Sequence, residues 1–315
     1  VGLLPAATVA RTLFRSEAAC AMFCGCSAHA VVPLTRAGTA AVGLLLGAAA
    51  FTTGWPIVEG GAQGLTNALV AQLTALGGVI HLNHNVEALG ELPAADATFF
   101  DTSIVAMEQI AGDGLSAAYK TRLRHFRPGP GMFKLDWALR EPIPWKSAAC
   151  ARAATVHLGG TMEEILRSEN DAFYGRVNTK PLVLLVQPSL FDATRAPAGQ
   201  HTAWAYCHVP TGFDGDLTDV IEAQVERFAP GFRDVVLARR ASGPAALAEW
   251  NPNLAGGDVS GGAMTLSQLV FRPTARMYRT SNERLFLCSA STPPGGGVHG
   301  MCGHMAALAA LRSLG

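Results

Sequence analysis

The sequence predicts a chain of mixed class, in which α/β segments lie on both sides of an α+β region. Strand and helix candidates alternate between residues 62 and 110. Five strand candidates with few helices follow between residues 132 and 241, a pattern typical of an antiparallel sheet. A strand, a glycine-rich turn and a helix then occupy residues 285–314.

Composition places the chain among globular proteins large enough for more than one core. It has 315 residues, of which 49% are hydrophobic and 15% charged. The 24 Lys and Arg residues balance the 24 Asp and Glu residues, which argues against a nucleic-acid partner. One run is rich in basic residues and is interpreted as a solvated helix face and turn, with an anion or lipid-headgroup site as the alternative. Its members are Lys120, Arg122, Arg124, His125 and Arg127.

The seven cysteines are odd in number and scattered, which indicates reduced thiols in a cytoplasmic setting. Cys20, Cys24 and Cys26 lie close to His29, but their surroundings are rich in Ala, Met and Phe. No second ligand pair with zinc-type spacing follows, so the sequence predicts packed thiols and no metal site.

The N-terminal fifty residues are strongly apolar. No charged region precedes 2–10, so we expect no secretory signal. Residues 11–50 are predicted to be helical with an interruption at Pro33. The apolar run 37–51 is shorter than the roughly 20 residues of a spanning helix. It is expected to be a buried helix or one that lines an apolar substrate channel, with peripheral membrane contact as the alternative.

After Gly54-Trp55-Pro56, leucines at helical spacing predict a helix over 62–76, ended by Gly77-Gly78. Short strands are predicted at 79–82, 86–89 and 97–100. Ser103 is expected to cap a helix over 103–110.

The middle of the chain supplies the predicted antiparallel sheet. Its strand candidates, several with alternating apolar residues, are 132–139, 153–158, 182–187, 202–209 and 233–241. Helices are predicted at 161–168, where Thr161 and Glu164 form a capping box, and at 217–228.

The turn from Gly295 to Gly300 has the spelling G-x-G-x-x-G, follows a predicted strand and opens a helix. Its glycines allow close backbone approach, and the helix start favours a phosphate or a carbonyl oxygen. It is not a dinucleotide fingerprint, because no second strand with a ribose-binding acid follows. A second near-match at 112–117 follows a helix and is interpreted as a helix–helix turn.

The stretch Leu285-Phe-Leu-Cys-Ser-Ala-Ser-Thr-Pro-Pro-Gly-Gly-Gly-Val-His-Gly300 resembles the C-terminal motif of phytoene dehydrogenase-related flavoproteins. Further segments agree with this family in order. They are Gly54-Trp55-Pro56 with Gly60-Gly61, Phe133–Leu139, Asn251-Pro252-Asn253 with Gly256-Gly257-Asp258, and Leu266–Pro273.

The resemblance implies a Rossmann-like FAD-binding domain interleaved with a substrate domain that contains an antiparallel or mixed sheet and apolar helices. FAD-domain segments would be 53–110 and 258–315, and substrate-domain segments 1–52 and 111–257. The residues implied to contact FAD are Gly60, Gly61, Val86, Ala290, Ser291, Gly295, Gly296, Gly297, Val298 and Gly300. His299 is the candidate for a catalytic role, with a polar turn residue as the alternative.

The family opens with a strand, G-x-G-x-x-G and a helix, and nothing before Arg11 offers that unit. The FAD-binding domain is therefore expected to be incomplete here, with an N-terminal half as the missing partner.

The resulting hypothesis is an FAD-dependent oxidoreductase that oxidises or desaturates an apolar substrate by hydride transfer to flavin. The alternative is a non-catalytic remnant, or a binding or scaffold protein that retains the substrate domain. Trp137, Trp145, Trp204 and Tyr206 would line an apolar cavity or pack in the core.

Overall fold

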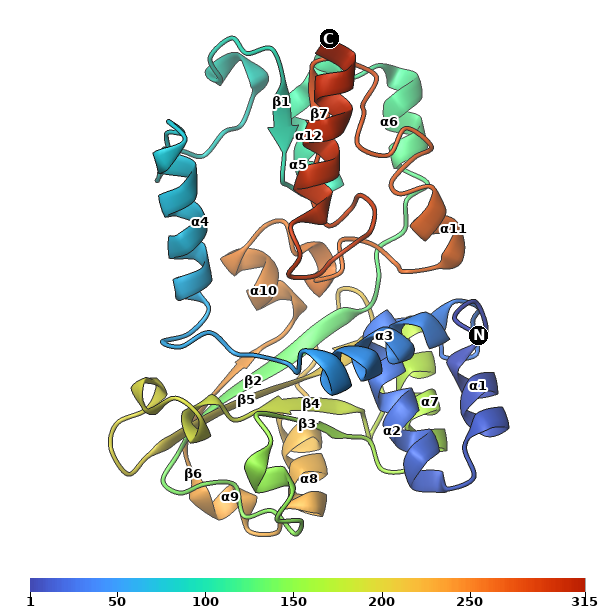
Figure 1. The fold of residues 1–315 in the computed structure, drawn as a ribbon, viewed down its shortest axis with the longest axis vertical. Coiled ribbons are helices and arrows are strands. Elements are labelled where there is room, and N and C mark those ends of the chain that lie inside the picture. Colours follow the sequence, from blue (N-terminus) through green and yellow to red (C-terminus); the bar gives the residue numbers. More distant parts are fainter. Residues whose placement is uncertain (315) are drawn as a thin grey trace.

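A computed structural model of the chain describes residues 1–314, which form two stacked units (Figure 1). The sheet unit, residues 1–52 and 131–242, contains a five-stranded sheet and the N-terminal helices. The turn unit, residues 98–126 and 258–314, contains a two-stranded sheet and the C-terminal helix. The strands are β1 (Thr98–Phe100), β2 (Gly131–Leu139), β3 (Thr155–Leu158), β4 (Val183–Val186), β5 (His201–Val209), β6 (Val236–Ser242) and β7 (Leu285–Leu287). The helices are α1 (Ala6–Leu13), α2 (Glu17–Ser27), α3 (Thr39–Thr52), α4 (Gln63–Ala75), α5 (Ile104–Ala111), α6 (Ala117–Leu123), α7 (Met162–Phe173), α8 (Thr218–Phe228), α9 (Phe232–Val235), α10 (Pro244–Trp250), α11 (Leu266–Val270) and α12 (Met301–Leu314).

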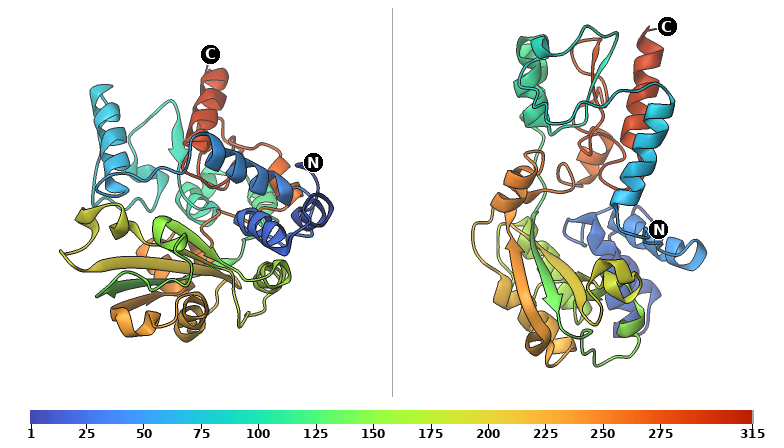
Figure 2. Two further views of the ribbon diagram at one scale, coloured as in Figure 1. Left: turned by 60° about the horizontal axis from the view of Figure 1, so that its bottom comes forward. Right: turned by 90° about the vertical axis from the view of Figure 1, so that its left-hand side faces the viewer.

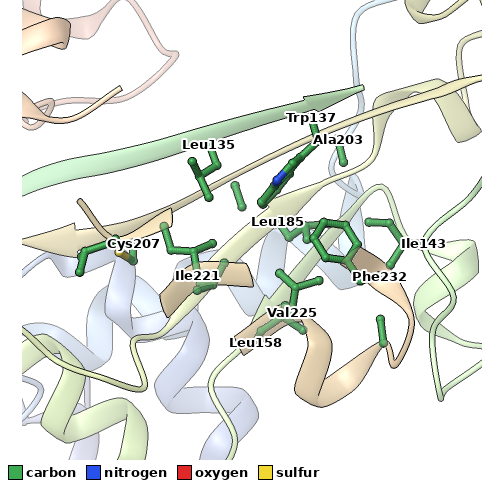
Figure 3. Packing of buried hydrophobic residues seen from close by; sticks show 14 of the residues in the cluster. Leu135, Trp137, Ile143, Leu158, Leu185, Ala203, Cys207, Ile221, Val225 and Phe232 are labelled. Atoms are coloured by element: carbon green, nitrogen blue, oxygen red, sulfur yellow. The ribbon is translucent and has the colours of Figure 1, made fainter. Parts of the chain in front are cut away.

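The five-stranded sheet has the order β3-β4-β5-β2-β6 and every pairing is antiparallel, as predicted. Alternate residues of β2 and β5 are buried, because successive side chains of a strand point to opposite faces. The buried face packs on α8 and α9, where Leu135 and Trp137 meet Ile221 and Phe232 (Figure 3). The opposite face of β2 and β5 carries half-buried polar and aromatic residues.

The N-terminal helices pack on α7, which begins with the predicted capping box of Thr161 and Glu164. Their core includes Cys20 and Cys24, so these thiols are packed side chains as expected. Helix α3 buries only Thr39, Ala40 and Gly43, so the prediction of a buried helix over 37–51 is wrong for its C-terminal part. Within residues 1–314, no helix is both long enough and apolar enough to span a bilayer.

The turn unit joins segments that are far apart in the sequence. Strand β1 pairs in parallel with β7, and their side chains form a core with α5 and α6. Ser103 caps α5 as predicted, and residues 112–114 form the expected turn before α6. Strand β7 ends at Leu287, earlier than predicted. The backbone amide of Cys288 still donates to Phe100 O, and the chain bends away directly after it.

From Leu44 to Phe99 no residue is buried, although the predicted helix α4 forms. In Figure 1 and in the left view of Figure 2, α4 stands apart from the rest of the molecule. The strands predicted at 79–82 and 86–89 are not formed. Strands require a neighbouring strand to satisfy their amides and carbonyls, and no described segment lies beside these residues to do so.

Two further boundaries differ from the prediction. The strand expected at 233–241 begins only at Val236, because the preceding residues form α9. Helices α10 and α11 were not predicted, and both are short elements in loop-rich sequence.

Candidate functional site

The glycine-rich turn lies between β7 and α12 and exposes backbone amides. Gly295 and Gly297 have φ values of 104° and 153°, a region that favours glycine. The amides of Gly296, Gly297 and Val298 donate to no acceptor within residues 1–314. These N–H groups precede the helix α12 and are therefore available to an anionic or carbonyl oxygen of a ligand.

A second loop, residues 258–263, packs directly on this turn. Ser291 Oγ donates to Gly261 O over 2.9 Å. A Cβ atom at Gly261 would lie 2.8 Å from the carbonyl carbon of Ala290, so only glycine allows this approach. Gly296 in turn lies against the backbone of Ser260. The two loops therefore form one structure.

Asp258 organises the 258–263 loop from inside. Its buried carboxylate accepts the amides of Gly129 at 2.7 Å, Ser260 at 2.8 Å and Gly262 at 2.8 Å. Hydrogen bonds from amides to a charged carboxylate are among the stronger ones in proteins. Asp258 thereby connects the loop to the segment that enters β2.

Arg272 is fully buried and joins both loops. It donates from Nε to Ala290 O at 2.9 Å, and from Nη2 to Ser260 O at 2.6 Å and Gly262 O at 3.3 Å. Burial lowers the pKa of Arg272 to about 10, although the charges of Asp258 and Cys302 act in the opposite direction. The guanidinium therefore remains charged at neutral pH.

Neither Asp258 nor Arg272 was predicted as a site residue. Both lie in segments that carry the family resemblance, and this was the signal that could have singled them out. Sequence spacing alone could not show that the two side chains converge on the same loop.

Six of the predicted FAD-contacting residues are brought close together with Ala290 in this turn: Ser291, Gly295, Gly296, Gly297, Val298 and Gly300. Ser291 and Gly295 are buried, whereas Gly296, Gly297, Val298 and Gly300 are exposed. The exposed His299 also lies here, and its Nδ1 accepts the amide of Met301 over 3.0 Å. His299 is thus a cap at the start of α12.

Gly60, Gly61 and Val86 lie elsewhere. The Gly60 amide donates to Asp192 Oδ2 over 2.8 Å, and Arg195 Nη1 donates to Gly60 O over 3.0 Å. This turn is therefore held by the loop between β4 and β5 in the sheet unit. Val86 is half-buried in an irregular segment. The structure does not bring these three residues to the C-terminal turn.

The four aromatic residues singled out in the sequence divide between two faces of the sheet. Trp137 is in the core, and Trp145 is half-buried with its Nε1 donating to Gln187. Trp204 and Tyr206 stack on the opposite face with ring centroids 6.3 Å apart. Lys134 Nζ lies 5.6 Å from the Trp204 ring centroid, so this face is both aromatic and polar.

Comparison with known proteins is informative at the level of fold. An oxidoreductase from Methanosarcina mazei superposes with a TM-score of 0.56 at 16% identity, over 95% of this chain and 65% of that one. Cyclohexylamine oxidase from Brevibacterium oxydans gives 0.51 at 10% identity, over 99% and 67%. The chain has a fold that oxidoreductases use.

Sequence relatives are oxidoreductases as well, although no protein-family model matches the chain. Pyridine nucleotide-disulfide oxidoreductase domain-containing protein 2 is 36% identical over 158 residues in Mus musculus, covering 46% of this chain and 27% of that protein. In Rattus norvegicus it is 27% identical over 300 residues, covering 82% and 52%. A lycopene-forming phytoene desaturase from Pseudescherichia vulneris is 26% identical over 284 residues, covering 80% and 55%. The chain thus spans about half the length of the rat protein and of the phytoene desaturase. Its match to the mouse protein covers about a quarter of that protein.

Proposed function

We propose that this chain is the substrate-binding and flavin-facing part of an FAD-dependent, phytoene dehydrogenase-like oxidoreductase that oxidises or desaturates an apolar substrate. The observation that carries the proposal is the pair of loops joined by Arg272, which presents the unpaired amides of Gly296, Gly297 and Val298. Relatives that are oxidoreductases support the reaction class.

The residues of the turn fit the flavin-facing half of FAD. Exposed amides at a helix start would donate to the polar edge of the ring, and Ala290 and Ser291 would line its approach. FAD, when bound, supplies the acceptor for a hydride, and the protein contributes position and electrostatics. Trp204 and Tyr206, on the half-buried sheet face, would bind an apolar substrate.

The adenine half of FAD is not accommodated by the described residues alone, because Gly60, Gly61 and Val86 lie away from the turn. We infer that a nucleotide-binding segment with a strand, a glycine-rich turn and a helix docks between α4 and β1. Strand β1 pairs only with β7 among the described strands, and parallel sheets are normally larger and buried on both faces. The apolar residues of α4 would be covered by the same segment.

The test is a titration of the whole chain with FAD, followed by flavin fluorescence and visible absorbance. We expect saturable binding that Gly297→Val weakens by about tenfold or more, because the side chain would strain the backbone and obstruct the amides. Gly199→Val is the matched control, since Gly199 also has positive φ but lies in open space away from the turn. Equal affinity of both variants would contradict the assignment of the turn.

Absence of any flavin binding, by the chain alone and with a nucleotide-binding segment from a relative added, would favour the alternative function. The chain would then be a non-catalytic binding or scaffold protein that keeps the substrate-binding sheet. The observation that favours this alternative is the position of Gly60, Gly61 and Val86, which lie away from the turn and leave the adenine half of FAD without the residues expected to contact it.

A further inference from the structure

A large cleft of about 1020 Å³ opens between the two units on the side of α11. The segment 122–130 and the residues around α11 form one wall, and Arg36 with the end of α7 forms the other. In Figure 1 these elements face each other on the right-hand side of the molecule. The exposed amides of the glycine-rich turn do not line this cleft, so it is distinct from the proposed flavin contact.

The charge of the cleft is of one sign. Three arginines and a histidine line it, and no Asp or Glu does: Arg36, Arg122, His125 and Arg127. Arg122, His125 and Arg127 belong to the basic run at 120–127, and Arg36 comes from the loop before α3. Folding therefore concentrates positive charge that is spread along the sequence.

These cations are not neutralised within the protein. Arg36, Arg122 and Arg127 form no ion pair with a carboxylate of residues 1–314. Arg124, in the same run, differs because its guanidinium lies 3.5 Å from Glu108 and does not line the cleft. Within the basic run, Arg124 is thus paired with Glu108, whereas Arg122 and Arg127 have no carboxylate partner among the described residues and line the cleft.

Arg36 is held in a defined orientation. Its guanidinium lies 4.6 Å from the ring centroid of Phe173, and its Nη2 donates to the Tyr174 hydroxyl over 3.3 Å. An arginine positioned by stacking loses less conformational entropy when it binds an anion. His125 is oriented too, because its Nδ1 donates to the Thr121 carbonyl over 2.9 Å and leaves Nε2 for a ligand.

The rest of the cleft wall is largely apolar. Phe126, Phe271 and Pro273 line it together with Pro128 and Pro130. Thr211, Thr265 and Ser267 line it as well. A site with cations at one place, apolar rings at another and few polar groups suits a ligand that has both an acidic group and an apolar body.

We propose that this cleft binds a small anionic amphiphile, a carboxylate or phosphate ester that carries an apolar tail. The acidic group lies among Arg36, Arg122 and Arg127, and the tail lies against Phe126 and Phe271. The proposal does not rest on the proposed function, because none of the exposed amides of the glycine-rich turn lines the cleft.

The experiment measures binding of dodecanoate and dodecyl phosphate to the full chain by isothermal titration calorimetry, below their micelle concentrations. We expect saturable binding to one site. Arg36→Gln and Arg127→Gln should each weaken it by about tenfold, the loss of one charge-assisted hydrogen bond. Arg124→Gln is the matched control from the same basic run, and Leu69→Gln tests adsorption on the exposed helix α4. Both controls should keep the affinity of the unaltered chain.

Further arms identify the ligand and its source. Dodecanol tests the charge, octanoate and inorganic phosphate test the tail, and vesicles with anionic phospholipid test a membrane headgroup. Weaker binding of all three small probes supports the proposal, whereas equal binding of dodecanol overturns it. Tight binding to vesicles that Arg127→Gln abolishes, without binding of free dodecanoate, also overturns the proposal in favour of a headgroup site. Equal losses for Arg124→Gln and Arg127→Gln overturn it, and circular dichroism verifies that every variant is folded.

Discussion

Two buried charged side chains, Arg272 and Asp258, hold the loops around the glycine-rich turn in place. Each uses its hydrogen-bonding groups on backbone atoms of the 258–263 loop, and they form no direct ion pair with one another in the structure. Buried charge is costly unless hydrogen bonds satisfy it, so residues of this kind are kept where geometry depends on them. The site is therefore rigid for a reason that can be tested.

Arg272→Met is expected to lower the free energy of unfolding by roughly 3 kcal/mol or more. The substitution leaves the carbonyl groups of Ala290, Ser260 and Gly262 without a donor and Asp258 without a compensating charge. Urea unfolding followed by circular dichroism measures this loss. Arg284→Met is the control, because Arg284 is exposed and its side chain donates no hydrogen bond within the described residues. A loss as large for Arg284→Met would contradict the role assigned to Arg272.

His157 is half-buried beside His29, with their Nε2 atoms 2.9 Å apart. Burial, and then the nearby His29, lower the pKa of His157 to about 4 from its ordinary 6.5. Between pH 6.5 and pH 4, such a histidine is protonated in the unfolded state but mostly unprotonated in the folded state. It therefore contributes stability that is lost as the pH falls from 6.5 toward 4.

We expect the free energy of unfolding to fall by about 2 kcal/mol between pH 7.5 and pH 5 through protonation of His157 alone. His157→Gln should remove most of this loss, because the amide does not titrate. Free energies of unfolding at both pH values, for the chain and the variant, measure the difference. His125→Gln, at an exposed position, should leave the pH dependence unchanged. An unaltered acid-side loss in His157→Gln would show that other groups cause it.

At the scale of elements, α4 and β2 both carry a regular apolar pattern, with helical spacing in α4 and alternation in β2, but their surroundings differ. Leu135 in β2 is 0% exposed, whereas Leu69 in α4 is 64% exposed. Most helical stability in proteins comes from packing of an apolar face, which α4 lacks in this chain. The helix therefore forms as the leucine spacing predicted, without a core to pack against in this chain.

Substitutions in these two elements should have opposite consequences. Leu135→Ala is expected to cost roughly 2–5 kcal/mol of unfolding free energy, because it leaves a cavity in the core. The double variant Leu69→Gln and Leu73→Gln should change the free energy of unfolding by only about 0.5 kcal/mol and should raise solubility. Chemical denaturation and the concentration at which the protein precipitates measure the two effects. A large destabilisation by the α4 substitutions would mean that α4 packs on the rest of the chain.

At the scale of the whole molecule, the segment 44–99 separates two well-packed units. It contains no buried residue, and α4 stands away from both sheets (Figure 1). Regions with few buried contacts open locally at low free energy, while core strands open only with global unfolding. The free energy of local opening is accordingly expected to be low in 44–99 and high in the strands of the sheet unit.

Hydrogen exchange followed by mass spectrometry should show fast exchange in 54–97 and the slowest exchange in β2 and β5. Limited proteolysis should cut first within 76–97, where the chain is exposed and irregular. Addition of the proposed nucleotide-binding segment together with FAD should protect α4 and β1. Protection of α4 equal to that of β2 in the chain alone would contradict this description.

Much of the fold followed from local patterns. Five strand-like segments, several with alternating apolar residues, predicted the antiparallel sheet, and the Thr161 capping box and Ser103 cap predicted the starts of α7 and α5. The two strands that do not form share one cause: residues 79–82 and 86–89 have strand-like sequences, but a strand exists only when a neighbour satisfies its backbone. The local sequence indicates which segments can form a strand, and hydrogen bonding to a neighbouring strand decides which of them do.

By itself, the sequence determined most of the helices and strands, the buried alternation of β2 and β5 and the glycine-rich turn at the start of α12, because these depend on residues close together in the chain. Only the tertiary structure decided that Arg272 and Asp258 lock that turn, and that Arg36 joins Arg122 and Arg127 in one cleft. It also separated Gly60 and Gly61 from the turn with which the sequence had grouped them. These outcomes depend on contacts between distant segments, whose geometry is set by packing and backbone pairing and is not encoded in any local pattern.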